Sequence, residues 1–183
     1  MWRGIYVDFS SCIRLATLRK QAVALLFLIA ASLPAFCAAP SSCPWLNAAT
    51  AGGFLGGDAT VTIKPSSPNK DDFICAFLHH KGNVTATLRI EVNTLTEPMT
   101  SHDAFELSAK QCGKTTIPLM AVGNEAMICK RRTKAGTLAE HVVGRVRNRV
   151  FLLDISSNAP HINESDLHDK VEQISEQVAG ILF

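Results

Sequence analysis

Apolar and polar residues alternate without a break between Val84 and Asn93. The apolar positions are every second residue, namely Val84, Ala86, Leu88, Ile90 and Val92. Successive side chains of a β-strand point to opposite faces, so a period of two predicts a strand with one buried and one solvated face. Antiparallel sheets can face water on one side, whereas parallel sheets are usually buried on both. The segment therefore predicts an antiparallel sheet as the framework of the fold.

Further segments have the composition of strands, with turn signals between some of them. They are residues 59–64, 73–79, 125–133, 138–146 and 149–156. Gly82-Asn83 suits a tight turn, and two of the residues 147–149 can join the last two segments into a hairpin. Whichever two form that turn, one face of the hairpin is expected to line the core. It carries Val142, Gly144, Val146, Phe151, Leu153 and Ile155.

Two helices are expected before the hairpin. Residues 45–55 are rich in alanine and precede Gly56-Gly57, which can end a short helix. Thr100 and Asp103 have the spacing of a capping box, and Gly113 is placed to end the helix that they begin.

A third, long helix is expected at the C-terminal end. Asn163 can cap it, with Asp166 as the partner in a capping box. The helix is expected to lay one apolar stripe on the sheet, formed by Leu167, Val171, Ile174, Val178 and Ile181. Together, these elements predict an α+β fold in which helices flank an antiparallel sheet.

Residues 1–39 have the pattern of a leader and an export signal. The basic pair Arg19-Lys20 precedes a run of ten apolar residues, Ala22–Ala31. Ten residues are too few to cross the roughly 30 Å of membrane hydrocarbon, and Pro34 interrupts a longer helix, so we expect cleavage rather than a membrane anchor. Residues 1–19 are long for such a leader. A start codon placed too far upstream would explain this, as would an extension without a role in export.

The chain after the signal, residues 42–183, has the size of a single domain. From Cys43 onward it carries 14 Lys and Arg and 15 Asp and Glu, so the net charge of +2 of the whole chain comes from the leader. A nearly neutral domain does not predict binding to nucleic acid or to a membrane surface through overall charge.

Four cysteines follow the expected signal, at Cys43, Cys75, Cys112 and Cys129. An even number of cysteines in an exported chain favours two disulfides. No pair has the Cys-x-x-Cys spacing of a zinc ribbon or a redox motif, so structural bridges are expected. The counting of cysteines leaves all three pairings open.

Several short motifs lie along the whole domain, namely Cys43–Leu46, Ala51–Gly57, Phe73–Phe77, Val122–Ala126 and Gly144–Phe151. With the order of the elements and the final amphipathic helix, they resemble a group of secreted bacterial domains of unknown function. Many of those are lipoproteins, and their fold is similar to that of the photosystem protein PsbP and the Ran-binding protein Mog1. The resemblance implies an α/β/α sandwich with bridges from Cys43 to Cys75 and from Cys112 to Cys129. Bulky Phe36 before Cys37 departs from the small residue that lipid attachment needs.

No residue pattern predicts catalysis, a metal or a cofactor. The four cysteines are expected to be committed to bridges, which leaves no free thiolate for a cysteine hydrolase. The sequence contains neither a nucleophile-elbow pattern nor a Gly-rich phosphate loop. His79 and His80 are neighbours on a strand and point to opposite faces, so a shared metal ion is not expected.

Charge is distributed unevenly along the domain. Lys130–Arg149 contains seven Lys or Arg and the single acid Glu140, whereas Asp154–Glu176 contains six acids and the single base Lys170. One interpretation is a patch for an anion or a protein partner, formed by Arg131, Arg132, Arg145, Arg147 and Arg149. The other, which we favour from the sequence, is a solvated hairpin whose charges are balanced by the acidic terminal helix.

The sequence thus predicts a secreted or periplasmic, non-catalytic protein that binds a protein partner or a small ligand outside the cytoplasm. Two other functions stay open. One is a structural accessory of an envelope complex, and the other is a hydrolase whose site is not recognisable in the sequence.

Overall fold

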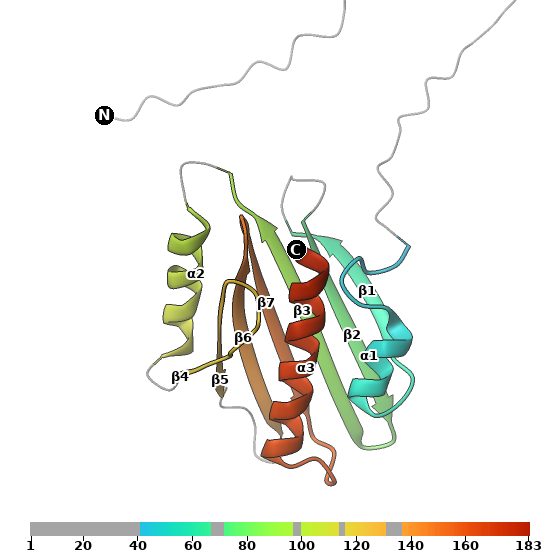
Figure 1. Ribbon diagram of the computed structural model, residues 1–183. Helices are drawn as coiled ribbons and strands as arrows, with labels where there is room; N and C mark the ends of the chain where they lie inside the picture. The colour runs from blue at the N-terminus through green and yellow to red at the C-terminus, as the bar shows by residue number, and fades with distance from the viewer. Residues whose placement is uncertain (1–40, 67–71, 97–99, 114–115, 131–136) are drawn as a thin grey trace, which may run out of the picture. The chain divides into compact units, whose positions relative to one another are not determined.

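The computed structural model describes residues 41–66, 72–96, 100–113, 116–130 and 137–183 (Figure 1). The expected leader and signal, residues 1–39, lie outside the described residues. So do Arg131 and Arg132 of the predicted basic patch.

The framework is an antiparallel sheet of seven strands in the order β1-β2-β3-β7-β6-β5-β4. Their bounds are β1 Thr60–Pro65, β2 Phe73–Lys81, β3 Val84–Thr94, β4 Thr116–Pro118, β5 Glu125–Lys130, β6 Leu138–Val146 and β7 Arg149–Ser157. The predicted antiparallel sheet is therefore confirmed. The short edge strand β4 was not predicted from the sequence. Strand β3 pairs with β7 in the centre, which brings segments from the two halves of the chain together.

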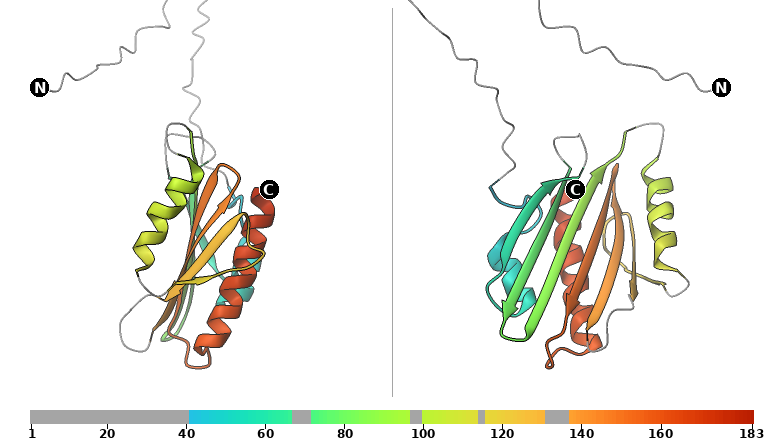
Figure 2. Two further views of the ribbon diagram at one scale, coloured as in Figure 1. Left: turned by 60° about the vertical axis from the view of Figure 1, so that its left-hand side comes forward. Right: turned by 180° about the vertical axis from the view of Figure 1, so that it is seen from behind.

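Helices cover both faces of this sheet (Figure 2). Helices α1 (Ala48–Leu55) and α3 (Glu164–Leu182) lie on one face, and α2 (Ser101–Ala109) lies on the other. The predicted helix up to Gly113 divides in two, because α2 ends at Ala109 and the 3₁₀ turn η1 follows at Lys110–Cys112. No helix in the described part of the chain is long and apolar enough to span a membrane.

The main core lies between the sheet and helices α1 and α3. The apolar side of the period-two strand faces it, so that Leu88 and Ile90 are fully buried. Gly144 lies on this face as predicted, and its lack of a side chain makes room for the ring of Phe151. A Cβ at Gly144 would lie 2.2 Å from the Cζ atom of Phe151. A smaller cluster on the opposite face packs α2 against β6 and β7, through Ala104, Phe105, Val143 and Val150.

Helix α3 begins as the sequence predicts and ends with a different buried residue. The Asn163 side chain accepts a hydrogen bond from the backbone N–H of Asp166, and the Asp166 carboxylate accepts one from the backbone N–H of Asn163. Ile181 is wrongly predicted as part of the buried stripe, because it is half exposed and Leu182 is buried instead. After Val178, a helix of 3.6 residues per turn can return to the same face at either the third or the fourth position. The fourth position faces the sheet here.

Two disulfides join Cys43 to Cys75 and Cys112 to Cys129, which is the pairing that the resemblance implies. The first bridge is buried in the main core and ties the segment before α1 to β2. The second ties η1, after α2, to β5 on the other face.

Candidate functional site

The described arginines of the predicted basic patch are spread around the β6–β7 turn. Arg145 lies on the α2 side of the sheet and reaches the helix. Arg149 is two residues before the core residue Phe151 on β7, so it lies on the same, α3 side of the sheet. Arg147 is exposed in the turn itself. The structure therefore does not bring these three side chains together on one face.

Arg145 has a role within the fold, because it helps to hold the start of α2 against the sheet. Its Nε donates a hydrogen bond to Glu125, and one terminal nitrogen lies 3.4 Å from the Ser101 hydroxyl. His102 also contacts Glu125, with 2.9 Å between Nδ1 and Oε1. Burial raises the pKa of Glu125, but the hydrogen bonds from His102 and Arg145 outweigh it and the net pKa is lowered. The hydrogen bond to Glu125 raises the pKa of His102.

Three segments far apart in the sequence converge around Arg147. The backbone N–H of Arg147 donates to the side chain of Asn124 at 2.6 Å, and the N–H of Asn124 donates to the carbonyl of Arg145 at 2.8 Å. The Arg147 guanidinium lies over the ring of Phe183, 5.9 Å from its centre. Met120, in the same loop as Asn124, is 78% exposed, and Phe183 is 54% exposed. We call Arg147 and Phe183, together with Met120 of the loop that Asn124 joins to Arg147, the tip surface.

The backbone beneath the tip surface is strained. Among the described residues other than glycine, Ala121 and Arg147 alone have a positive φ, of 62° and 54°. Residues with a side chain lose roughly 1–2 kcal/mol in the left-handed region. A positive φ at only the first residue of a two-residue hairpin turn is the pattern of a type II′ turn, where glycine is preferred. An arginine at this position is therefore costly to the fold.

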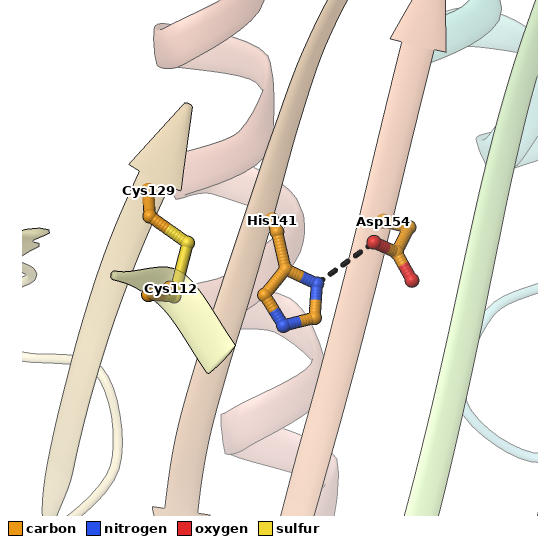
Figure 3. Close-up of a disulfide and its surroundings, with 4 residues drawn as sticks. All are labelled: Cys112, Cys129, His141 and Asp154. Carbon is orange, nitrogen blue, oxygen red and sulfur yellow. Dashed lines mark hydrogen bonds and ion pairs between the residues drawn. A yellow bond between two sulfur atoms is a disulfide. The ribbon is translucent and has the colours of Figure 1, made fainter. Parts of the chain in front are cut away.

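A second candidate site lies on the α2 side of the sheet, where one residue from each of four neighbouring strands forms a row. Strand register places Arg89, Asp154, His141 and Cys129 side by side. We call this set the polar row. Figure 3 shows the His141 ring between Asp154 and the Cys112–Cys129 disulfide. Nδ1 of His141 lies 2.7 Å from the Asp154 carboxylate, whose other oxygen is 3.6 Å from Arg89.

His141 is 3% exposed, and its Nε2 has no hydrogen-bond partner among the described residues. A buried polar group left in this state costs about 1–3 kcal/mol. Neither His141 nor Asp154 belongs to a motif that is recognisable in the sequence. A signal was present, because a turn at residues 147–148 places them opposite each other, but the sequence left the turn residues open.

Glu140, next to His141 in sequence, faces the main core. One of its oxygens is 3.5 Å from Nδ1 of His168 on α3, and the other has no partner among the described residues. Burial raises the pKa of Glu140. Beside it, Lys130 and Glu164 form an exposed ion pair. A hollow at this end of α3 is lined by Leu138, Ser157, Ala159, Ile162 and Asn163 among others.

The paired histidines lie as the strand pattern predicts, on opposite faces of β2. His79 is buried and its Nδ1 donates to the carbonyl of Asp58 at 2.8 Å. His80 is exposed and its Nδ1 lies 3.1 Å from the Thr85 hydroxyl.

No family model, curated protein or solved structure matches the chain.

Proposed function

We propose that the chain is an exported domain that binds a protein partner outside the cytoplasm through its tip surface. The observation that carries this proposal is the exposed Arg147, held at a positive φ in its turn and stacked over the exposed Phe183. Strained residues of this kind cluster at functional sites. A strained residue without a function is readily replaced, because a stabilising substitution is easy to find. At Arg147 that substitution is glycine.

The chemistry of the tip surface favours a protein as the partner. Arginine, methionine and aromatic side chains are enriched at protein interfaces, where they supply contact area and hydrogen bonds. An arginine stacked on an aromatic ring is partly ordered before binding, which reduces the entropy lost on association. A structural accessory of an envelope complex would use the same surface.

The expected signal and the two disulfides support a location outside the cytoplasm, where such bridges persist. The helices on both faces of the sheet and the cysteine pairing support the resemblance to exported domains with an α/β/α sandwich similar to PsbP and Mog1.

The test is affinity capture from the extracytoplasmic fraction of the native cell, with the wild-type protein and the variant Arg147→Gly as baits. We expect the variant to lose the captured partner while its free energy of unfolding stays equal or rises by up to about 1 kcal/mol, since the strain is relieved. Lys81→Ala removes one exposed charge at the opposite end of the sheet and serves as the matched control. Equal capture by wild type and Arg147→Gly would contradict the proposal.

A photo-crosslinking residue at Met120 provides a second, direct measurement. We expect it to form a covalent adduct with the captured partner, whereas the same residue at Lys81 forms none. Adducts from Lys81 but not from Met120 would place the interface at the other end of the sheet.

A further inference from the structure

The two disulfides lie in different surroundings. Cys75 is fully buried and Cys43 is 8% exposed, so the first bridge is enclosed by the main core. Cys129 of the second bridge is 3% exposed, but Cys112 is only partly buried in the short turn η1. Cys112 is therefore the more exposed cysteine of the second bridge, and Cys129 is the enclosed one.

The enclosed sulfur has a titratable neighbour. His141 follows Cys129 in the polar row, so both side chains lie on the same face of adjacent strands. Cross-strand neighbours of this kind have Cβ atoms about 4.5–5.5 Å apart. Asp154 accepts the hydrogen bond from Nδ1 and orients the ring, while Nε2 is left without a partner among the described residues. A histidine oriented by a carboxylate beside a sulfur atom is an arrangement that activates cysteine thiols.

We infer that the Cys112–Cys129 disulfide is a thiol–disulfide exchange site, which accepts electrons from the cysteine thiols of an exported protein. Cys112 is the sulfur that is attacked, and Cys129 is the leaving group. His141 is a positioning residue, because it acts on the substrate only through Cys129. Cys75 of the first bridge has no histidine as a cross-strand neighbour, because it lies between Ile63 of β1 and Ile90 of β3.

The exchange balances in two steps. A substrate thiolate attacks the sulfur of Cys112, a bond forms between these two sulfurs, and the Cys112–Cys129 bond breaks with its electron pair on Cys129. The His141 ring, which Asp154 holds beside Cys129, is the polar neighbour of the leaving Cys129 thiolate. A second substrate thiolate then attacks the substrate sulfur, and Cys112 leaves as a thiolate. The substrate dithiol is oxidised to a disulfide, and the cysteine pair takes up its two electrons. The two protons that the substrate thiols release to solvent as they ionise are balanced by the two protons that the Cys112 and Cys129 thiolates take up from solvent.

Reduced glutathione serves as the thiol probe on the oxidised full chain. Free thiols are alkylated at successive times and located by mass mapping of peptides. We expect the Cys112–Cys129 bridge to open at least about tenfold faster than the Cys43–Cys75 bridge, with glutathione attached to Cys112. Opening of both bridges at one rate, resistance of both, or glutathione on Cys129 would each overturn the inference.

Exposure alone could make Cys112 react faster, so the role of His141 needs its own measurement. We expect His141→Gln to slow the opening about tenfold, because the leaving thiolate loses its imidazole neighbour. His80→Gln alters an exposed histidine on the same face of the sheet and should leave the rate unchanged.

A spectroscopic measurement separates this role from a loss of packing. In the variant Cys112→Ser, the ultraviolet absorbance of the Cys129 thiolate should appear at a lower pH than in Cys112→Ser with His141→Gln. Asp154→Asn should shift the absorbance in the same direction as His141→Gln, and it provides a second variant should His141→Gln fail to fold. Identical absorbance profiles in all folded variants would show that His141 and Asp154 are structural only.

Discussion

At the scale of single residues, Glu140 is the group whose charge conflicts most clearly with its surroundings. It is 4% exposed, and only one of its two oxygens has a partner among the described residues, His168 at 3.5 Å. Burial penalises the carboxylate and raises the pKa of Glu140 above its ordinary 4.5. Between the ordinary and the raised value, the folded state binds more protons than the unfolded state. Stability therefore falls as the pH rises through this range.

The variant Glu140→Gln keeps the shape of the side chain and removes the charge. At neutral pH we expect it to be more stable than wild type by about 1–2 kcal/mol, because the core no longer contains a charged carboxylate with one unpartnered oxygen. The gain should shrink as the pH falls toward 4.5, where wild-type Glu140 is itself protonated. Urea unfolding at several pH values measures both effects.

Glu164 provides a control with the opposite sign. Its hydrogen bond with Lys130 lowers the pKa of Glu164, so its contribution to stability is present at neutral pH and is lost on acidification. A Glu140→Gln protein that is less stable than wild type at neutral pH would show that the contact with His168 outweighs the cost of burial.

At the scale of elements, the features that could be predicted from the sequence are those that depend on interactions between residues close together in the chain. The cap of α3 was predictable because Asn163 and Asp166 contact each other across three residues. The face of the sheet on which each residue of β6 and β7 lies was predictable, because a short turn fixes the register of the two strands of a hairpin. Strand β4 was not predictable, since Thr116–Pro118 has three exposed residues and is defined by its pairing with β5.

The candidate sites also differ in how far they depend on local interactions and how far on contacts between distant segments. A run of arginines is visible in the sequence, but its distribution over two faces and a turn depends on which residues occupy the turn. A turn at residues 147–148 would have paired His141 with Asp154, but the whole polar row could not be predicted, for a stronger reason. Its members come from β3, β5, β6 and β7, and only the order of the strands brings Arg89 beside Asp154. That order depends on contacts between distant segments, which no local pattern encodes.

The capping box gives a prediction for α3 as an element. Asn163→Ala removes the side chain that accepts from the Asp166 N–H and should lower the free energy of unfolding by about 1 kcal/mol. Asn163→Ser keeps an oxygen that can accept the same hydrogen bond and should retain most of the stability. Urea unfolding of the three proteins checks the order. Equal losses in both variants would mean that the contribution of Asn163 does not come from capping.

At the scale of the whole molecule, each disulfide lies within one half of the sheet. Cys43–Cys75 belongs to the half that contains β1 to β3, and Cys112–Cys129 belongs to the half that contains β4 to β7. The two halves meet where β3 pairs with β7 along nine residues of each strand. This central seam is therefore held by backbone pairing and core packing, while the bridges stabilise the parts on either side of it.

Removal of each bridge tests this division. The bridged cysteines are separated by 32 and 17 residues, so loop closure alone predicts a similar loss of about 3–4 kcal/mol for either bridge. Burial should separate them, because replacing Cys43 and Cys75 by alanine also leaves a cavity in the main core. We expect that double variant to be the less stable one, and Cys112→Ala with Cys129→Ala to stay folded, as an exchange site that opens during its reaction requires.

Loss of both bridges removes about 6–8 kcal/mol, comparable to the whole stability of many domains, so the variant without the four cysteines should not fold. Urea unfolding followed by circular dichroism measures all three, and a reversed order of the two double variants would contradict the assignment of the structural and the reactive bridge.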